Sequence, residues 1–214
     1  MTGWTDDRGK QLTDYPRPSV AVDTALLTVR DETLCVAIVD RGGSKRLPGT
    51  FLHEGELLAE AVERSLQQRV GLRGVVPRQL RTFDAIDRDN RGRVLSVAHM
   101  IALPEHQLID IGVVPIDEAV GLDFDHDLIV AEAVAALRRE YADHPDPARL
   151  LGECFTILDL HRTHLAIDPT TAHKDTFRRA MMRQLVETDQ METGTVGKPA
   201  RLYRRVCRFC ARTS

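Results

Sequence analysis

The segment between residues 47 and 72 carries the side chains that are best spaced for chemistry. Ser65, Gln68 and Arg69 follow one another on a stretch whose apolar residues recur with a helical period. Positions spaced i, i+3 and i+4 lie on one face of a helix, so we expect these three side chains to share a face. A hydroxyl, an amide and a guanidinium do not suit Mg²⁺, which requires anionic oxygen ligands. The sequence therefore predicts that this face holds no metal and has no catalytic residue.

Arg69 has two possible roles that the sequence leaves open. Its guanidinium offers paired donors, so it can neutralise a phosphate group directly and without a cation. Alternatively, it pairs with Glu56 or with another nearby carboxylate, and the surrounding pocket is vestigial. In either case a metal-dependent reaction at this face would lack both charge neutralisation by a cation and a metal-activated water.

The second set of side chains with chemical potential lies near the C-terminus. Residues 174–214 contain 10 Lys and Arg against 4 Asp and Glu, although the whole chain has a net charge of −3. An acidic body with a basic tail is typical of a nucleic-acid surface at the tail. A single arginine here is as well explained as a solvated surface charge, but the group favours contact with DNA, because arginine suits guanine edges and phosphates.

A helix from about residue 172 to 184 would present these cations. Phe177, Met181 and Leu185 share its inward stripe, which leaves the other face for DNA. The polar residues expected on the outward face are Thr176, Arg178, Arg179 and Arg183.

The remaining elements follow from periodicity and from turn residues. Alternating or β-branched runs predict strands at 19–29, 33–40, 75–87, 94–103 and 113–116. Helical stripes predict helices at 56–70, closed by Gly71 as a C-cap, and at 127–141. After a Pro- and Asp-rich break at 142–147, a helix with Thr156 as N-cap runs to about Leu165. Strands at 185–187 and 201–206 flank a Gly-rich turn at 193–199.

The segment from Leu47 to Leu72 resembles the Nudix box, the signature of enzymes that cleave nucleoside diphosphates linked to another moiety. Leu47–Phe51 stands where the family has Leu-Pro-Gly-Gly-Phe, and Glu56 and Arg64 occupy the first acidic and the arginine positions. The three helix carboxylates of the family fall on Ser65, Gln68 and Arg69. Asp87–Ala98 further resembles the turn and strand after the box in ADP-ribose-type members. The short segment 41–46 lacks the aromatic residue of relatives, which puts the inherited ligand in doubt.

Residues 151–206 resemble the C-terminal winged helix of the NrtR family, Nudix-related transcriptional regulators of NAD metabolism. The resemblance rests on Glu153–Leu160, on Lys174–Arg179 and, most specifically, on Gly197–Tyr203. Together with the Nudix-like half, it covers nearly the whole chain. It implies a homodimer that binds a palindromic operator near genes of NAD synthesis or salvage, with ADP-ribose or a related nucleotide as effector at the former Nudix site.

The resemblance also implies a fold, domain boundaries and binding residues. We expect an α+β Nudix sandwich with a mixed sheet over residues 1–142, a linker over 143–150, and a winged helix-turn-helix domain over 151–214. The expected effector-binding residues are Arg46, Glu56, Arg64 and Arg69. The expected DNA-binding residues are Lys174, Thr176, Arg178, Arg179, Arg183, Lys198 and Arg201.

The function hypothesis is therefore a DNA-binding transcriptional regulator, a repressor, with an inactive Nudix domain and no cofactor. A Nudix-type hydrolase with an appended module is the first alternative, and a winged helix that binds protein is the second. The sequence has no run of about 18 apolar residues that would span a membrane, and Met1–Lys10 lacks the apolar stretch of a signal peptide. We expect a cytoplasmic protein.

Isolated histidines and cysteines carry little functional weight in this sequence. His53, His99 and His126 have no partner at catalytic spacing and are interpreted as structural or exposed. Cys35 and Cys154 lie beside apolar residues and are predicted to be buried. The CxxC pair at 207 and 210 has no second pair with metal-binding spacing, so no zinc site is predicted.

Overall fold

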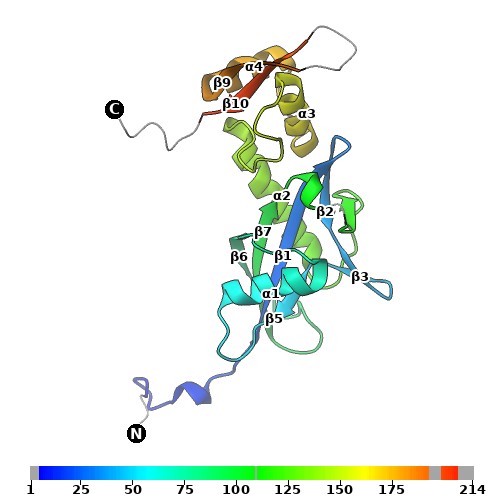
Figure 1. Ribbon diagram of the computed structural model, residues 1–214. Helices are drawn as coiled ribbons and strands as arrows, with labels where there is room; N and C mark the ends of the chain where they lie inside the picture. The colour runs from blue at the N-terminus through cyan, green and yellow to red at the C-terminus, as the bar shows by residue number, and fades with distance from the viewer. Residues whose placement is uncertain (1–4, 109, 193–198, 207–214) are drawn as a thin grey trace.

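The computed structural model describes residues 5–108, 110–192 and 199–206 (Figure 1). Its central sheet has the strand order β6-β7-β1-β2-β8, and β5 also pairs with β1. The six strands are β1 (Ser19–Arg30), β2 (Thr33–Ala37), β5 (Gly49–Phe51), β6 (Arg78–Phe83), β7 (Val94–Ala102) and β8 (Val113–Pro115). Because β1 is parallel to β7 and antiparallel to β2 and β5, the sheet is mixed, as expected.

One helix covers each face of this sheet, α1 (Leu58–Val70) in front and α2 (His126–Asp143) behind (Figure 1). Alternate side chains of β1 serve the two faces, because a strand has a period of two. Val22 packs with the apolar stripe of α1, whereas Ala25 and Leu27 pack with that of α2. The result is the predicted α/β/α sandwich, in which Asp23 of β1 is buried on the α2 face and lies 3.4 Å from His126 of α2.

Several predicted boundaries agree with the structure. The helix α1 ends at Val70, and Gly71 takes the left-handed conformation of a C-cap. The short segment after β2 forms its own hairpin from β3 (Val39–Arg41) and β4 (Ser44–Arg46). The described ranges also contain three short 3₁₀ helices, η1 (Leu12–Asp14), η2 (Glu105–Gln107) and η3 (Met182–Gln184). Within the described ranges no helix is both long and apolar enough to cross a membrane.

The C-terminal elements form a second core beyond the end of α2 (Figure 1). They are α3 (Ile157–Ile167), α4 (Lys174–Met181), β9 (Leu185–Met191) and β10 (Arg201–Arg205). Thr156 caps α3 by accepting a hydrogen bond from the Asp159 N–H at 3.1 Å, as its position in the sequence indicates. Phe177, Met181 and Leu185 are buried, which confirms the inward stripe predicted for this region.

The two cores meet at a buried carboxylate. Asp146 lies in the segment expected to be a linker, yet its side chain accepts hydrogen bonds from the Tyr141 hydroxyl at 2.6 Å and from the Leu150 N–H at 2.8 Å. Arg205 of β10 forms an ion pair with the same carboxylate and donates to the Asp146 carbonyl oxygen at 3.1 Å. The end of α2 is therefore tied to the last described strand, and the boundary at 143–150 stays a prediction.

A buried histidine packs across the same junction. The His164 ring lies against Tyr141 of α2 and Phe177 of α4, with ring centroids 4.9 and 4.8 Å away. Burial lowers the pKa of His164 to about 4, so its imidazole is neutral near pH 7.

One prediction about the cysteines is wrong: Cys35 is buried as expected, but Cys154 is exposed, because its neighbour Phe155 takes the place in the core.

Candidate functional site

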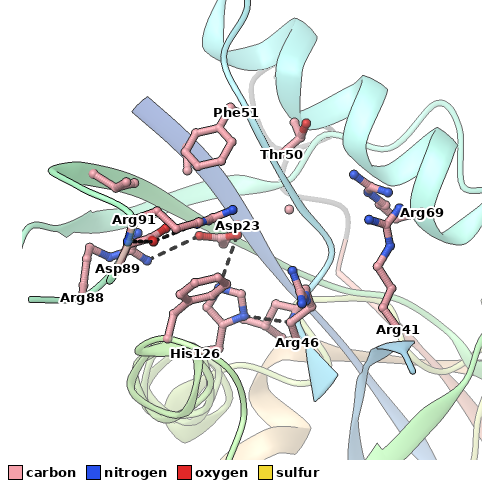
Figure 2. A pocket seen from close by; sticks show the side chains of 15 residues that line it. Asp23, Arg41, Arg46, Thr50, Phe51, Arg69, Arg88, Asp89, Arg91 and His126 are labelled. Carbon is pink, nitrogen blue, oxygen red and sulfur yellow. Dashed lines mark hydrogen bonds and ion pairs between the residues drawn. The ribbon is translucent and has the colours of Figure 1, made fainter. Parts of the chain in front are cut away.

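A polar cavity of about 230 Å³ opens at the end of the sheet where β1, β5 and the start of α2 meet (Figure 2). Asp23 and His126 lie on its floor, while arginines from the β3–β4 hairpin and from α1 line one side. Phe51 and Arg91 lie across from Arg41 and Arg69, and Phe124 lies near both Arg91 and Arg46. Residues from several separate elements thus contribute to one pocket.

The floor of the pocket is held by Asp23. Its carboxylate accepts a hydrogen bond from the Ser96 hydroxyl at 2.6 Å and lies 3.4 Å from His126 Nε2. The other ring nitrogen, Nδ1, accepts a hydrogen bond from the Leu47 N–H at 2.9 Å, so the proton of neutral His126 belongs on Nε2. Burial opposes the ionisation of Asp23, but the hydrogen bonds from His126 and Ser96, together with nearby positive charge, outweigh it and keep the pKa of Asp23 below its ordinary value.

A buried arginine completes the floor. The Arg88 guanidinium donates to both carboxylate oxygens of Asp125, at 2.6 and 3.0 Å, and lies 3.7 Å from Asp23. This bidentate pair compensates the charge of Arg88, as burial requires. The polar groups of the floor therefore pair with one another. Arg88 is already bound to Asp125, so it has little capacity left to bind a ligand.

The three arginines on one side of the pocket, Arg41, Arg46 and Arg69, differ in whether a carboxylate neutralises their charge. Arg46 pairs with Asp123 at 2.8 Å and stacks 5.7 Å from the centre of the Phe124 ring. Arg41 and Arg69, by contrast, have no carboxylate within 4.0 Å in the part of the chain that the structure describes. Burial lowers the pKa of Arg69, and the charges of Arg41, Arg46 and Arg64 lower it further.

Two aromatic side chains, Phe51 and Phe124, also line the pocket. The Arg91 guanidinium lies 5.4 Å from the centre of the Phe51 ring and 5.3 Å from that of Phe124. Asp89 holds it in place with two hydrogen bonds, at 2.6 and 2.9 Å, and the bonds from Arg91 lower the pKa of Asp89 to about 2. Both rings are partly exposed, so their uncovered surfaces can contact a planar ligand group.

The structure separates the four residues expected to bind an effector. Arg46 and Arg69 line the pocket, whereas Glu56 and Arg64 do not. Arg64 donates to the two oxygens of Glu56 at 2.7 and 2.8 Å and to the Phe51 carbonyl oxygen at 2.9 Å. This pair braces the loop before α1. The alternative in which Arg69 pairs with Glu56 is wrong, because Arg64 already occupies that carboxylate.

Other features of the pocket are not predicted by the sequence. The short 41–46 segment lacks the aromatic residue of relatives, but its hairpin brings Arg41 into the lining together with the expected Arg46. The aromatic surface comes instead from Phe51 and Phe124, which lie 73 positions apart in the chain. A Gly-Gly turn with flanking arginines is the available signal for Arg41. No local signal marks Phe124.

Gly49 permits the close approach of β5 to the pocket floor. A Cβ at this position would overlap the Asp23 carboxylate and lie 3.0 Å from the Val22 carbonyl oxygen. We therefore predict that Gly49→Ala lowers the free energy of unfolding by about 1–3 kcal/mol, as overpacking does, measured by urea denaturation. Gly112→Ala is the matched control, since its nearest contact would be an ordinary 3.7 Å. Equal stability of both variants would contradict this role of Gly49.

The predicted DNA-binding residues lie on the second core. Lys174, Thr176, Arg178 and Arg179 are exposed on α4, opposite the buried Phe177. The other three members of the predicted set differ from these. Arg183 lies on η3, Arg201 forms an ion pair with Glu187 across the β9–β10 ribbon, and Lys198 lies outside the described residues.

A short cationic helix in front of a two-stranded ribbon is the arrangement of a winged helix, in which the second helix of the helix-turn-helix enters the major groove. The family model of the NrtR DNA-binding winged helix domain matches residues 147–205. Residues 147–205 of this chain thus resemble the NrtR winged helix both in sequence and in the arrangement of their elements. In this arrangement α4 holds the place of the second helix of the helix-turn-helix, and β9–β10 holds that of the wing.

The resemblance to NrtR extends over both domains. An ADPR-responsive transcriptional repressor, NtrR, from Acinetobacter baylyi is 27% identical over 215 residues, which cover 91% of this chain and 84% of that protein. The crystal structure of Shewanella oneidensis NrtR with a 27mer DNA has a TM-score of 0.72 at 27% identity, covering 87% of this chain and 93% of that one.

The Nudix half has a solved relative of its own. The NUDIX domain of Shewanella oneidensis NrtR in complex with ADP-ribose has a TM-score of 0.52 at 25% identity. The match covers 63% of this chain and 99% of that domain. The chain thus has the Nudix sandwich and the winged helix of NrtR, in the same order.

Proposed function

We propose that this protein is a transcriptional repressor that binds a palindromic DNA operator as a homodimer and responds to ADP-ribose or another NAD-related nucleotide. The observation that carries the proposal is α4, whose exposed face holds Lys174, Thr176, Arg178 and Arg179 in a domain of the NrtR winged-helix family. Its targets are genes of NAD synthesis or salvage, and its place is the cytoplasm. The DNA-bound and ADP-ribose-bound NrtR structures support the two ligands.

The Nudix domain in this proposal binds its ligand without cleaving it. Ser65, Gln68 and Arg69 stand where Nudix enzymes have metal-binding carboxylates, and Arg64 occupies the remaining Glu56. A hydrolase would need those anionic oxygens to hold Mg²⁺ and to activate water. The relative that covers 91% of the chain is a repressor, which supports the same conclusion.

DNA binding is tested with the protein's own upstream DNA. Fluorescence anisotropy should give an affinity at least about a thousandfold above that for unrelated DNA of the same length, the order expected for a specific regulator. Adding ADP-ribose should weaken this affinity, because a repressor that senses a nucleotide has different affinities for operator in its two liganded states. Equal affinity for both DNAs would contradict the proposal and would favour a winged helix that binds protein.

Catalytic inertness is a separate prediction. ADP-ribose incubated with the protein and Mg²⁺ should survive, with no release of AMP above the rate in protein-free buffer, measured by chromatography. The physical reason is the absence of a carboxylate cluster for the cation among the described residues. Release of AMP in proportion to protein concentration, abolished by EDTA, would identify a hydrolase instead.

A further inference from the structure

The face that binds divalent cations in Nudix enzymes does not fit a cation in this protein. Ser65 is fully buried and its hydroxyl has no hydrogen-bond partner among the described residues, while Gln68 is exposed outside the pocket lining. Glu56 is engaged by Arg64 and by the His53 N–H at 2.8 Å, and the bonds from Arg64 lower its pKa to about 2. Over the described ranges no group of three or more His, Cys, Asp and Glu side chains is arranged to hold a metal.

Two guanidinium groups, those of Arg41 and Arg69, can supply the positive charge that a divalent cation would otherwise provide. Figure 2 shows Arg69 of α1 and Arg41 of β3 side by side at one wall of the pocket. Neither has an ion-pair partner in the described part of the chain, in contrast to Arg46, Arg64, Arg88 and Arg91. Like charges that meet without a counter-charge repel each other, and an anion placed between them relieves that repulsion. The pocket is therefore poised for an anion.

We propose that Arg41 and Arg69 take the place of the divalent cation and bind the diphosphate of a nucleoside diphosphate ligand directly. Each guanidinium presents a planar pair of donors that matches two phosphate oxygens, and two such groups suit two linked phosphates. The chemical class of ligand follows from the whole pocket, because Phe51 and Arg91 lie across from the two arginines and, with Phe124, offer aromatic and cationic contacts to a nucleoside. This inference rests on the proposed effector role of the pocket and specifies how the pocket works.

The test is calorimetry of the full chain with ADP-ribose, in EDTA and in Mg²⁺. We expect the wild type to bind equally well in both buffers. Arg69→Gln and Arg41→Gln should each weaken binding by roughly 10- to 100-fold, as the loss of charge-assisted hydrogen bonds does. Arg69→Lys keeps the charge but loses the paired donors, so it should lie between the wild type and Arg69→Gln. Arg73→Gln, an exposed arginine just after α1, is the control with the same change of charge.

Inorganic pyrophosphate and adenosine separate the two halves of the pocket. Pyrophosphate should compete with ADP-ribose in the wild type but not in Arg69→Gln, whereas competition by adenosine should be the same in both. A requirement for Mg²⁺, or no binding of ADP-ribose in either buffer, would overturn the inference.

Operator affinity measured on the same samples distinguishes this inference from the proposed function. If ADP-ribose binds only with Mg²⁺ and still shifts operator affinity, the proposed repressor function is supported and direct binding of the diphosphate by Arg41 and Arg69 is contradicted. If ADP-ribose binds in EDTA but no operator is bound, direct binding of the diphosphate by the two arginines is supported and the proposed repressor function is contradicted.

Discussion

Replacing Arg178 and Arg179 together with alanine should abolish specific operator binding while the fold stays intact. Both side chains are exposed on α4, and Phe177 and Met181 on the opposite face are untouched by the change. An arginine that contacts a base edge contributes about 1–3 kcal/mol, so the double variant should lose roughly 100-fold or more in affinity. Alanine favours the helix at least as well as arginine does, so α4 itself should persist.

Salt dependence separates phosphate contacts from base contacts. Each phosphate contact that is lost should reduce the slope of log affinity against log salt by about one unit. The control is Arg73→Ala with Arg139→Ala, which removes the same charge from the Nudix half. Fluorescence anisotropy at several salt concentrations measures both effects. If the α4 variant and the control bind the operator equally, the DNA surface does not include these two arginines.

Loss of the Asp146 carboxylate should produce the largest change in stability. Asp146 is fully buried and binds Arg205, the Tyr141 hydroxyl and the N–H groups of Leu150 and Leu151. Asp146→Ala leaves a partly buried guanidinium and several donors without a partner. Breaking a buried ion pair on one side costs about 3–5 kcal/mol, and we expect a loss of that order in the free energy of unfolding.

Urea denaturation followed by circular dichroism measures this loss. Asp143→Ala is the matched control, because that side chain is exposed nearby and its removal should change stability by no more than about 0.5 kcal/mol. The double variant Asp146→Ala, Arg205→Ala should lose less than the sum of the two single variants, since the second change removes the stranded charge. Additive losses would show that the two side chains are not coupled.

The sequence was sufficient for features that depend on local spacing. The i, i+3, i+4 relation of Ser65, Gln68 and Arg69 follows from helical geometry alone, so the order of the residues shows that these three side chains share a face. The stripe of Phe177, Met181 and Leu185 likewise predicted which face of α4 is buried. Both features lie within a few turns of one helix, where periodicity determines which side chains are neighbours.

The composition of the 142–147 segment does not reveal how Asp146 is bound. Proline and aspartate are typical of a solvated linker, and the sequence offered no sign that Asp146 is buried. Its burial depends on Arg205, which lies 59 positions later in the chain. An unpaired carboxylate would be unstable in that place. The pairing of Arg205 with Asp146 therefore becomes evident only in the folded structure, where β10 lies against the end of α2.

The ligand pocket divides in the same way between sequence and structure. The sequence places Arg69 where the Nudix resemblance implies a carboxylate, and it places the Nudix half before a winged helix. Only the tertiary structure decided that Arg64 satisfies Glu56 and that Arg41 from a separate hairpin lies beside Arg69. The physical reason is that charge compensation acts through space. Whether a guanidinium is free for a ligand depends on which carboxylates the fold brings within about 4 Å of it.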